Sequence, residues 1–196
     1  MRRLSLAILL ASSLTACSRF SEPAEFTVVN GAEPQTLDPA IISGQPEGRV
    51  VNALFEGLLA RNAKGELIPG VAESWEISED GKTYTFRLRQ DARWSNGDPV
   101  IAQDFEKSWE RVLNPVTGSV YSELLFFIEG AEDYLKKEPR DWNKVGVKSL
   151  DDRTLQVTLR NPTPYILDMP TFPPLNPVNT ESNTQHSHNR KQPGEH

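Results

Sequence analysis

Residues 73–89 read ESWEISEDGKTYTFRLR, and this stretch has the pattern of a β-hairpin. In its first half, Trp75 and Ile77 alternate with polar residues, as side chains of a half-buried strand do. Asp80 and Gly81 then supply a turn. The return half has an apolar side chain at every second position: Tyr84, Phe86 and Leu88. The stretch therefore predicts two antiparallel strands with one apolar face that must be covered.

A second hairpin and an amphipathic helix are predicted further along the chain. KVGVKSLDDRTLQVTLR (144–160) bends at Asp151-Asp152, and its return half has three apolar residues on one face: Leu155, Val157 and Leu159. Between the hairpins, apolar residues recur at helical spacing until Pro115, which cannot continue a helix: Phe105, Trp109 and Val112. Residues 120–135 also have a helical pattern. We therefore expect an α+β fold of β-hairpins packed by amphipathic helices.

The N-terminal third gives weaker signals. Residues 26–29 form a short β-rich run that stops at the turn pair Asn30-Gly31. AKGEL (63–67) is a further turn. Between them, apolar residues at i, i+4 and i+8 predict one face of a helix that has Pro46 near its start: Val50, Leu54 and Leu58.

The stretch DARWSNGDPVIAQDF (91–105) allows two interpretations. Trp94 beside acidic residues would suit a pocket for a cationic or sugar ligand, but the stretch would equally suit a turn between a strand and a helix. Asn96-Gly97 favours a turn with positive φ, and Asp98-Pro99 directs the chain toward a helix. We favour the turn, with Trp94 and Phe105 packed inward.

Composition excludes some classes of protein. The chain has 196 residues, a net charge of −6, 37% apolar residues and 24% charged residues. This balance is typical of a soluble globular protein, and the negative charge argues against a nucleic-acid partner.

The N-terminus has the pattern of a secretory signal. Two arginines precede an apolar run that is too short to be a permanent membrane helix. The run ends in LTAC (14–17), and Cys17 is the chain's single cysteine. The pattern resembles a bacterial lipoprotein signal, which implies removal of residues 1–16, lipidation of Cys17 and a polar tether over residues 17–25. An ordinary secretory signal cut near the same place is the alternative.

Motifs for catalysis are missing from the sequence. It contains no GxGxxG, GxxxxGK[ST] or GxSxG pattern. All three histidines lie in a polar C-terminal stretch without apolar periodicity, which we expect to be disordered and not to hold a metal: His186, His188 and His196. A catalytic carboxylate pair stays formally open, but most of the 27 acidic residues suit a solvated surface. We therefore expect binding rather than enzyme activity, with no cofactor.

Several ordered segments resemble a known family, the solute-binding proteins of oligopeptide ABC transporters in the peptide/nickel-binding group. They are EPQTLDPA (33–40), LFEGLL (54–59), PGVAESWEIS and DGKTYTFRLR (69–89), DARWSNGDPVIAQDF (91–105) and SWERVLNP (108–115). Further segments are similar to the oligopeptide-binding branch in particular: YSEL (121–124), IEGAEDY (128–134), GVKSLDDRTLQVTL (146–159) and NPTPY (161–165).

The resemblance implies a two-lobed receptor that closes over an oligopeptide by a hinge and delivers it to a membrane permease powered by an ATPase. Such a receptor would lie in the periplasm or cell envelope, here anchored through Cys17. The family holds peptides largely through main-chain hydrogen bonds. By this resemblance, the segment before the first helix would supply strand-like backbone to the peptide, and its candidates are Ser43, Gly44, Gln45 and Pro46.

The sequence departs from the family pattern in two ways. Ile101 stands where the motif usually has a threonine that caps the following helix, and a lost cap costs about 1 kcal/mol. The sequence is also several hundred residues shorter than the family, with a tail that looks frameshifted or truncated. The resemblance therefore divides it into a partial first lobe (26–55), an inserted α+β subdomain (56–170), and a truncated return to the first lobe with a disordered, aberrant tail (171–196).

These departures lower our expectation for activity. We expect a truncated two-lobed binding protein that is inactive by itself, with exposed apolar surface where the missing sheet would dock and a tendency to associate. One alternative is a lipoprotein fragment, such as a pseudogene product, that binds nothing. The other is that a full-length relative binds a dipeptide, nickel or heme.

Overall fold

The computed structural model describes residues 27–163 and 165–179. The described residues from Gly31 onward fall into one compact unit, and residues 27–30 belong to a separate N-terminal unit. Residues 27–29 contain no strand, so the predicted strand over 26–29 is wrong in its described part. A strand needs a neighbour to accept its hydrogen bonds, and none pairs with these residues within the described ranges. Cys17 and the C-terminal histidines lie outside the described residues.

Four antiparallel strands form the main sheet, in the order β3-β4-β6-β5. Their bounds are Ala72–Ile77, Thr83–Leu88, Thr154–Thr158 and Val147–Asp151, respectively. Both predicted hairpins are confirmed, and they join through β4 and β6, where Phe86 pairs with Leu155. The first turn has Gly81 at a φ of 69°. The second turn lies at residues 152–153, one position later than predicted.

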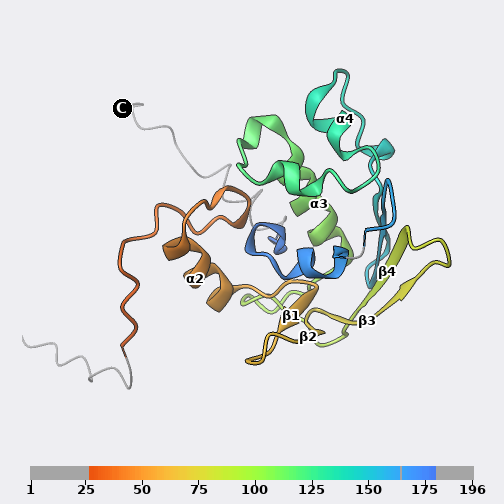
Figure 1. The fold of residues 1–196 in the computed structure, drawn as a ribbon. Coiled ribbons are helices and arrows are strands. Elements are labelled where there is room, and N and C mark those ends of the chain that lie inside the picture. Colours follow the sequence, from red (N-terminus) through yellow and green to blue (C-terminus); the bar gives the residue numbers. More distant parts are fainter. Residues whose placement is uncertain (1–26, 164, 180–196) are drawn as a thin grey trace, which may run out of the picture. The chain divides into compact units, whose positions relative to one another are not determined.

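Helix α3 (Ala102–Leu113) packs on one side of this sheet against β5 and β6 (Figure 1). It begins and ends as predicted, with Asn114-Pro115 after it. Its apolar stripe is fully buried, together with the inward residues of β4 and β6: Phe105, Trp109, Val112, Phe86, Leu88, Leu155 and Val157. Residues 120–135 are only partly α-helical, because a 3-10 turn (Ser122–Leu125) precedes the short helix α4 (Ala131–Lys136).

Helix α2 (Gln45–Leu54) does not have the predicted apolar face. Val51 is buried at 0% exposure, whereas Leu54 is 63% exposed. Leu58 is buried, but it lies beyond the end of the helix in the segment that leads to β1. The predicted face is wrong because the helix ends at Leu54 and the backbone of Phe55 is extended. Residues four positions apart share a face only within a helix.

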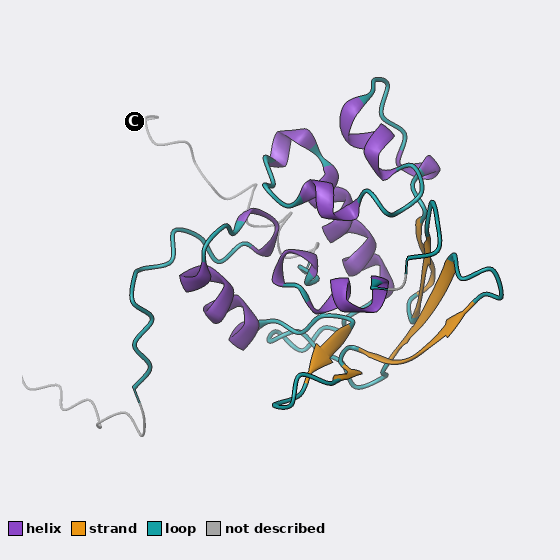
Figure 2. Ribbon diagram, viewed as in Figure 1, coloured by secondary structure: helices purple, strands orange, loops and turns teal. Residues whose placement is uncertain are grey.

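Two further strands, β1 (Leu59–Arg61) and β2 (Leu67–Pro69), form a small separate sheet that the sequence pattern did not indicate. The turn predicted between them is confirmed, with Gly65 at a φ of 80°. The remaining elements are 3-10 turns: Pro39–Ile41, Pro115–Thr117, Trp142–Lys144, Ile166–Thr171 and Pro173–Leu175. Figure 2 shows where the helices and strands lie along the chain, and β1 contacts the Ile166–Thr171 turn. In the described ranges, no helix has both the length and the apolar character needed to cross a bilayer.

Candidate functional site

The predicted ligand-contacting segment, residues 43–46, lies where an extended loop becomes helix α2. Gly44 is the N-cap and has extended backbone (φ −115°, ψ 166°). Gln45 and Pro46 are already the first residues of the helix, so strand-like backbone is wrong for this pair. Pro46 suits this position because its ring fixes φ near the helical value and its missing N–H would have no helical partner. Ser43, Gly44 and Gln45 are exposed, and Pro46 is half-buried.

A buried carboxylate holds this loop in place. Glu47 is only 6% exposed, and its Oε1 accepts a hydrogen bond from the backbone N–H of Gln35 at 3.0 Å. This bond, with further bonds from the N–H groups of Glu47 and Gly44, lowers the pKa of Glu47. A Cβ on Gly44 would lie 2.4 Å from Oε2 of Glu47, so only glycine fits there without displacing the carboxylate.

Tyr121 contacts the same loop from a distant part of the chain. Its hydroxyl donates to the backbone carbonyl of Ser43 at 3.3 Å. Its ring packs edge-on against Phe172, with centroids 5.1 Å apart. Sequence reasoning did not identify Tyr121 or Glu47 as site residues. The signals were weak: Tyr121 stood in the YSEL segment, and Glu47 looked like an ordinary acid in the first turn of a helix.

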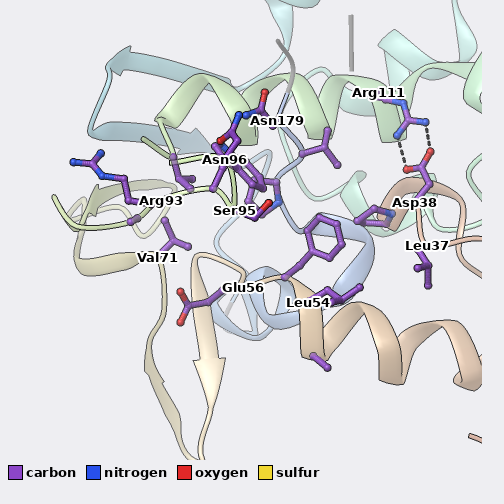
Figure 3. A pocket seen from close by; sticks show the side chains of 18 of the residues that line it. Leu37, Asp38, Leu54, Glu56, Val71, Arg93, Ser95, Asn96, Arg111 and Asn179 are labelled. Atoms are coloured by element: carbon purple, nitrogen blue, oxygen red, sulfur yellow. Dashed lines mark hydrogen bonds and ion pairs between the residues drawn. The ribbon is translucent and has the colours of Figure 1, made fainter. Parts of the chain in front are cut away.

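A separate cavity of about 940 Å³ lies beside the end of α2. Figure 3 shows its walls, which come from residues 37–39, 53–56, 92–96 and 177–179 together with single residues from other segments. None of the four predicted contact residues lines it. The structure therefore separates the predicted peptide segment from this cavity.

The stretch 91–105 is the predicted turn, and part of it also lines this cavity. Gly97 has a φ of 93°, and its N–H donates to the carbonyl of Trp94 at 2.9 Å. Trp94 packs against the core, as predicted, and its Nε1 donates to the buried carboxylate of Asp104 at 3.0 Å. Asp104 also accepts the N–H of Ile101 at 3.1 Å. Ile101 itself makes no side-chain cap hydrogen bond, because its side chain has no acceptor.

Ion pairs neutralise much of the charge on the cavity walls. Arg111 donates two hydrogen bonds to the carboxylate of Asp38, the pair drawn in Figure 3. This hydrogen bonding raises the pKa of Arg111. On another wall, Arg89 donates to Glu56 at 2.5 Å. The bidentate Asp38–Arg111 pair joins the N-terminal segment to α3.

Metal coordination finds no support in the described part of the chain. Within residues 27–163 and 165–179, no three His, Cys, Asp or Glu side chains are grouped to hold an ion.

Comparison with known proteins identifies close similarities. The family model "Bacterial extracellular solute-binding proteins, family 5 Middle" matches residues 66–194. The periplasmic oligopeptide-binding protein OppA of Escherichia coli is 43% identical over 174 residues, which are 87% of this chain and 32% of the relative. OppA of Haemophilus influenzae is 42% identical over 165 residues, 82% of this chain and 30% of the relative.

Solved structures agree with the sequence matches. The H. influenzae OppA complex with RPPGFSPFR superposes with a TM-score of 0.75 at 40% identity, covering 80% of this chain and 31% of that one. The substrate-binding domain of an oligopeptide ABC transporter from Bacillus anthracis gives a TM-score of 0.77 at 37% identity, covering 84% and 31%. The chain therefore spans about a third of the length of the relatives it matches.

Proposed function

Because the chain belongs to the family 5 bacterial extracellular solute-binding proteins, we propose that it forms part of the solute-binding component of an ABC transporter for oligopeptide uptake. The observation that carries the proposal is the joint match, in sequence and in structure, to the H. influenzae protein that was solved with the peptide RPPGFSPFR. The partners would be oligopeptides, a permease and an ATPase. Lipidation of Cys17 would hold the protein in the periplasm or cell envelope.

Residues 43–45 are exposed, so a peptide has access to this loop as the proposed recognition requires. A peptide laid beside this loop would form backbone hydrogen bonds, which do not depend on the peptide's side chains. Glu47 would keep the loop in position, and Tyr121 would hold Ser43 from the other side. Water-filled pockets would then accept varied side chains.

The chain by itself would not bind peptides tightly, because most of a relative's length has no counterpart in it. In our proposed division, residues 26–55 and 171–196 belong to an incomplete lobe, and residues 56–170 form a subdomain inserted in it. A second candidate function, a lipoprotein fragment that binds nothing, is favoured by the same short coverage.

Relatives differ in the ligands that their names state. A dipeptide-binding protein of Bacillus subtilis is 44% identical, and a probable deoxycholate-binding protein of E. coli is 37% identical. A murein peptide-binding protein of E. coli is 39% identical. The OppA proteins and two of these three relatives have peptides in their names, so peptides are the ligand class that the relatives favour.

A chimera tests this proposal. The matched region of the H. influenzae protein is replaced by the corresponding region of this chain, and RPPGFSPFR binding is measured by calorimetry. We expect the chimera to bind within about tenfold of the parent, a difference of about 1.4 kcal/mol, and the chain alone to show no micromolar binding. A monodisperse, folded chimera that does not bind would overturn the proposal.

Two glycines of one segment test the site within that chimera. Gly44→Ala would push the new Cβ against Glu47, whereas Gly48→Ala places a Cβ where no atom lies within 4 Å. We expect Gly44→Ala to weaken peptide binding by about tenfold and Gly48→Ala to leave it unchanged. Equal affinities would remove residues 43–46 from the proposed site.

A further inference from the structure

The proposed peptide-contacting residues lie in a segment that a carboxylate holds at each end. We call residues 38–47 the contact segment. At its C-terminal end, Glu47 accepts the backbone N–H of Gln35 at 3.0 Å. At its N-terminal end, the carboxylate of Asp38 accepts two hydrogen bonds from Arg111 (Figure 3). The conformation of the contact segment therefore depends on these contacts at its two ends.

Asp38 connects Arg111 to the backbone of the contact segment. Its Oδ1 accepts a hydrogen bond from Nη1 of Arg111 at 2.5 Å and another from the N–H of Ala40 at 3.2 Å. Asp38 is also the N-cap of the 3-10 turn Pro39–Ile41. This turn ends just before the exposed stretch that begins at Ser43. A guanidinium on α3 therefore orients the turn that leads into the proposed peptide-contacting residues.

Helix α3 gives Arg111 a rigid base. Its neighbours Trp109 and Val112 are each 1% exposed, so the last turns of the helix are fixed in the core. The side chains of Asp38 and Arg111 are 28% and 32% exposed, so solvent only partly screens their attraction. Bidentate, charge-assisted hydrogen bonds are also stronger and more directional than neutral ones. The pair can therefore transmit the position of α3 to the contact segment.

Recognition through main-chain hydrogen bonds requires backbone groups that point in fixed directions. A segment that is ordered before the peptide arrives does not lose its conformational entropy on binding. We propose that Arg111 is a positioning residue for peptide binding, which acts through Asp38 to hold the contact segment in its binding conformation. The inference rests on the proposed function, and it assigns Arg111 no contact with the peptide.

Substitutions of Arg111 in the chimera described above test the inference. Arg111→Met removes the guanidinium from a side chain of similar shape, and Arg111→Lys keeps the charge but loses the bidentate geometry. We expect the Kd for RPPGFSPFR, measured by calorimetry, to rise about tenfold with Arg111→Met and about threefold with Arg111→Lys. Melts followed by circular dichroism establish that each variant is folded at the temperature of the titration.

Arg89→Met is the matched control. Arg89 pairs with Glu56 on another wall of the same cavity, and their side chains are 35% and 46% exposed. That pair does not contact the contact segment, so its loss should leave the Kd unchanged.

A double variant tests whether Arg111 acts through Asp38. Asp38→Asn keeps a side-chain oxygen that can accept the N–H of Ala40, but it removes the charged partner of Arg111. If the pair acts as a unit, adding Arg111→Met to Asp38→Asn should weaken peptide binding no further. Losses that add would show that Arg111 acts by another route and would overturn the inference.

Hydrogen exchange in the full chain gives a readout that does not depend on the chimera. We expect Arg111→Met to speed amide exchange in residues 40–45 and to leave β4 and β6 unchanged. Faster exchange in the sheet as well would indicate a loss of overall stability and would contradict a positioning role.

The outcomes separate the inference from the proposed function. If the chimera binds RPPGFSPFR equally well with and without Arg111→Met, the inference fails and the proposed function stands. If the unmodified chimera is folded and does not bind, the proposed function fails and the inference fails with it.

Discussion

Two regions of the chain, residues 72–159 and residues 31–56, differ in how much apolar surface each buries. The first region closes a four-stranded sheet over α3 and buries that helix's stripe almost completely. The second contains α2 and a 3-10 turn but no strand, and it buries single side chains such as Ile42 and Val51. Side-chain contacts to the rest of the fold hold it, including Asp38–Arg111 and Tyr121–Ser43.

The difference shows that two parts of one chain can bury their apolar side chains to different extents. A region that buries its own apolar face has a stability determined by its own packing. A region that leaves leucines exposed gains less stability from apolar burial. The stability of the two regions can therefore be tested separately in this chain.

Replacing Trp109 should destabilise residues 72–159. The side chain is 1% exposed, and its Nε1 donates to the carbonyl of Leu175 at 2.9 Å. We expect Trp109→Ala to lower the free energy of unfolding by about 3–5 kcal/mol, measured by urea denaturation. Val116→Ala, at a residue that is 91% exposed, is the control and should change it by less than about 0.5 kcal/mol. If the two variants lose similar amounts of unfolding free energy, Trp109 is not a core residue on which the stability of the fold depends.

Glu106 ties the helix to the sheet and should make this region sensitive to acid. Its carboxylate accepts the Nε1–H of Trp142 at 2.9 Å and the N–H of Ser149 at 2.8 Å. Burial raises the pKa of Glu106, but the hydrogen bonds from Ser149 and Trp142 outweigh burial and hold the pKa below its ordinary value of 4.5. The stabilisation is therefore present above about pH 4.5 and is lost as the pH falls through the lower, folded-state pKa.

Glu106→Gln should lower the free energy of unfolding at pH 7 by about 1–3 kcal/mol, because the amide cannot accept all of these bonds. The gap to the unmodified chain should close as the pH falls below 4.5, which urea unfolding at a series of pH values would measure. Glu79→Gln, at an exposed turn residue, should show no such convergence. A pH-independent gap would mean that the carboxylate charge is not what stabilises the contact.

Asp38→Asn should destabilise residues 31–56 and leave residues 72–159 unchanged. Removing one partner of the half-buried Asp38–Arg111 pair should cost about 1 kcal/mol. Hydrogen exchange should speed up over residues 37–54 and stay unchanged in β4 and β6. Asp168→Asn, which breaks the exposed pair with Arg61, serves as the control. Faster exchange in the sheet instead would show that the two regions unfold together.

Ile101→Thr should give the smallest change, and a favourable one. Threonine supplies the side-chain acceptor that the N-cap of α3 lacks, so we expect a gain of about 0.5–1 kcal/mol in the free energy of unfolding. Ile101→Val changes the shape similarly without adding an acceptor. If valine and threonine have equal effects in thermal denaturation, the missing N-cap does not reduce the stability of α3.

The hairpins and α3 could be predicted from the sequence because their signals are local. Alternation at Tyr84, Phe86 and Leu88 specifies a half-buried strand whatever lies elsewhere. The face predicted for α2 was wrong because Leu58 lies past the helix end, and periodicity alone does not show where a helix stops. The β-rich run at 26–29 forms no strand in its described part, since a strand depends on a partner that local pattern cannot supply.

The candidate site was less accessible to sequence reasoning. Residues 43–46 came from the family resemblance, and the structure gives Gln45 and Pro46 a helical rather than an extended backbone. Tyr121 is 78 positions from the carbonyl it contacts, and such a pairing leaves no local trace. The cavity wall likewise assembles segments from both ends of the described chain.

The strand order β3-β4-β6-β5 has a consequence for synthesis on the ribosome. The β3–β4 hairpin is made early, but the inner edge of β4 waits for β6, which is complete only when Thr158 has been translated. Until then that edge presents unpaired N–H and carbonyl groups to other chains. A nascent chain that ends between the two hairpins would therefore be prone to aggregate through this edge.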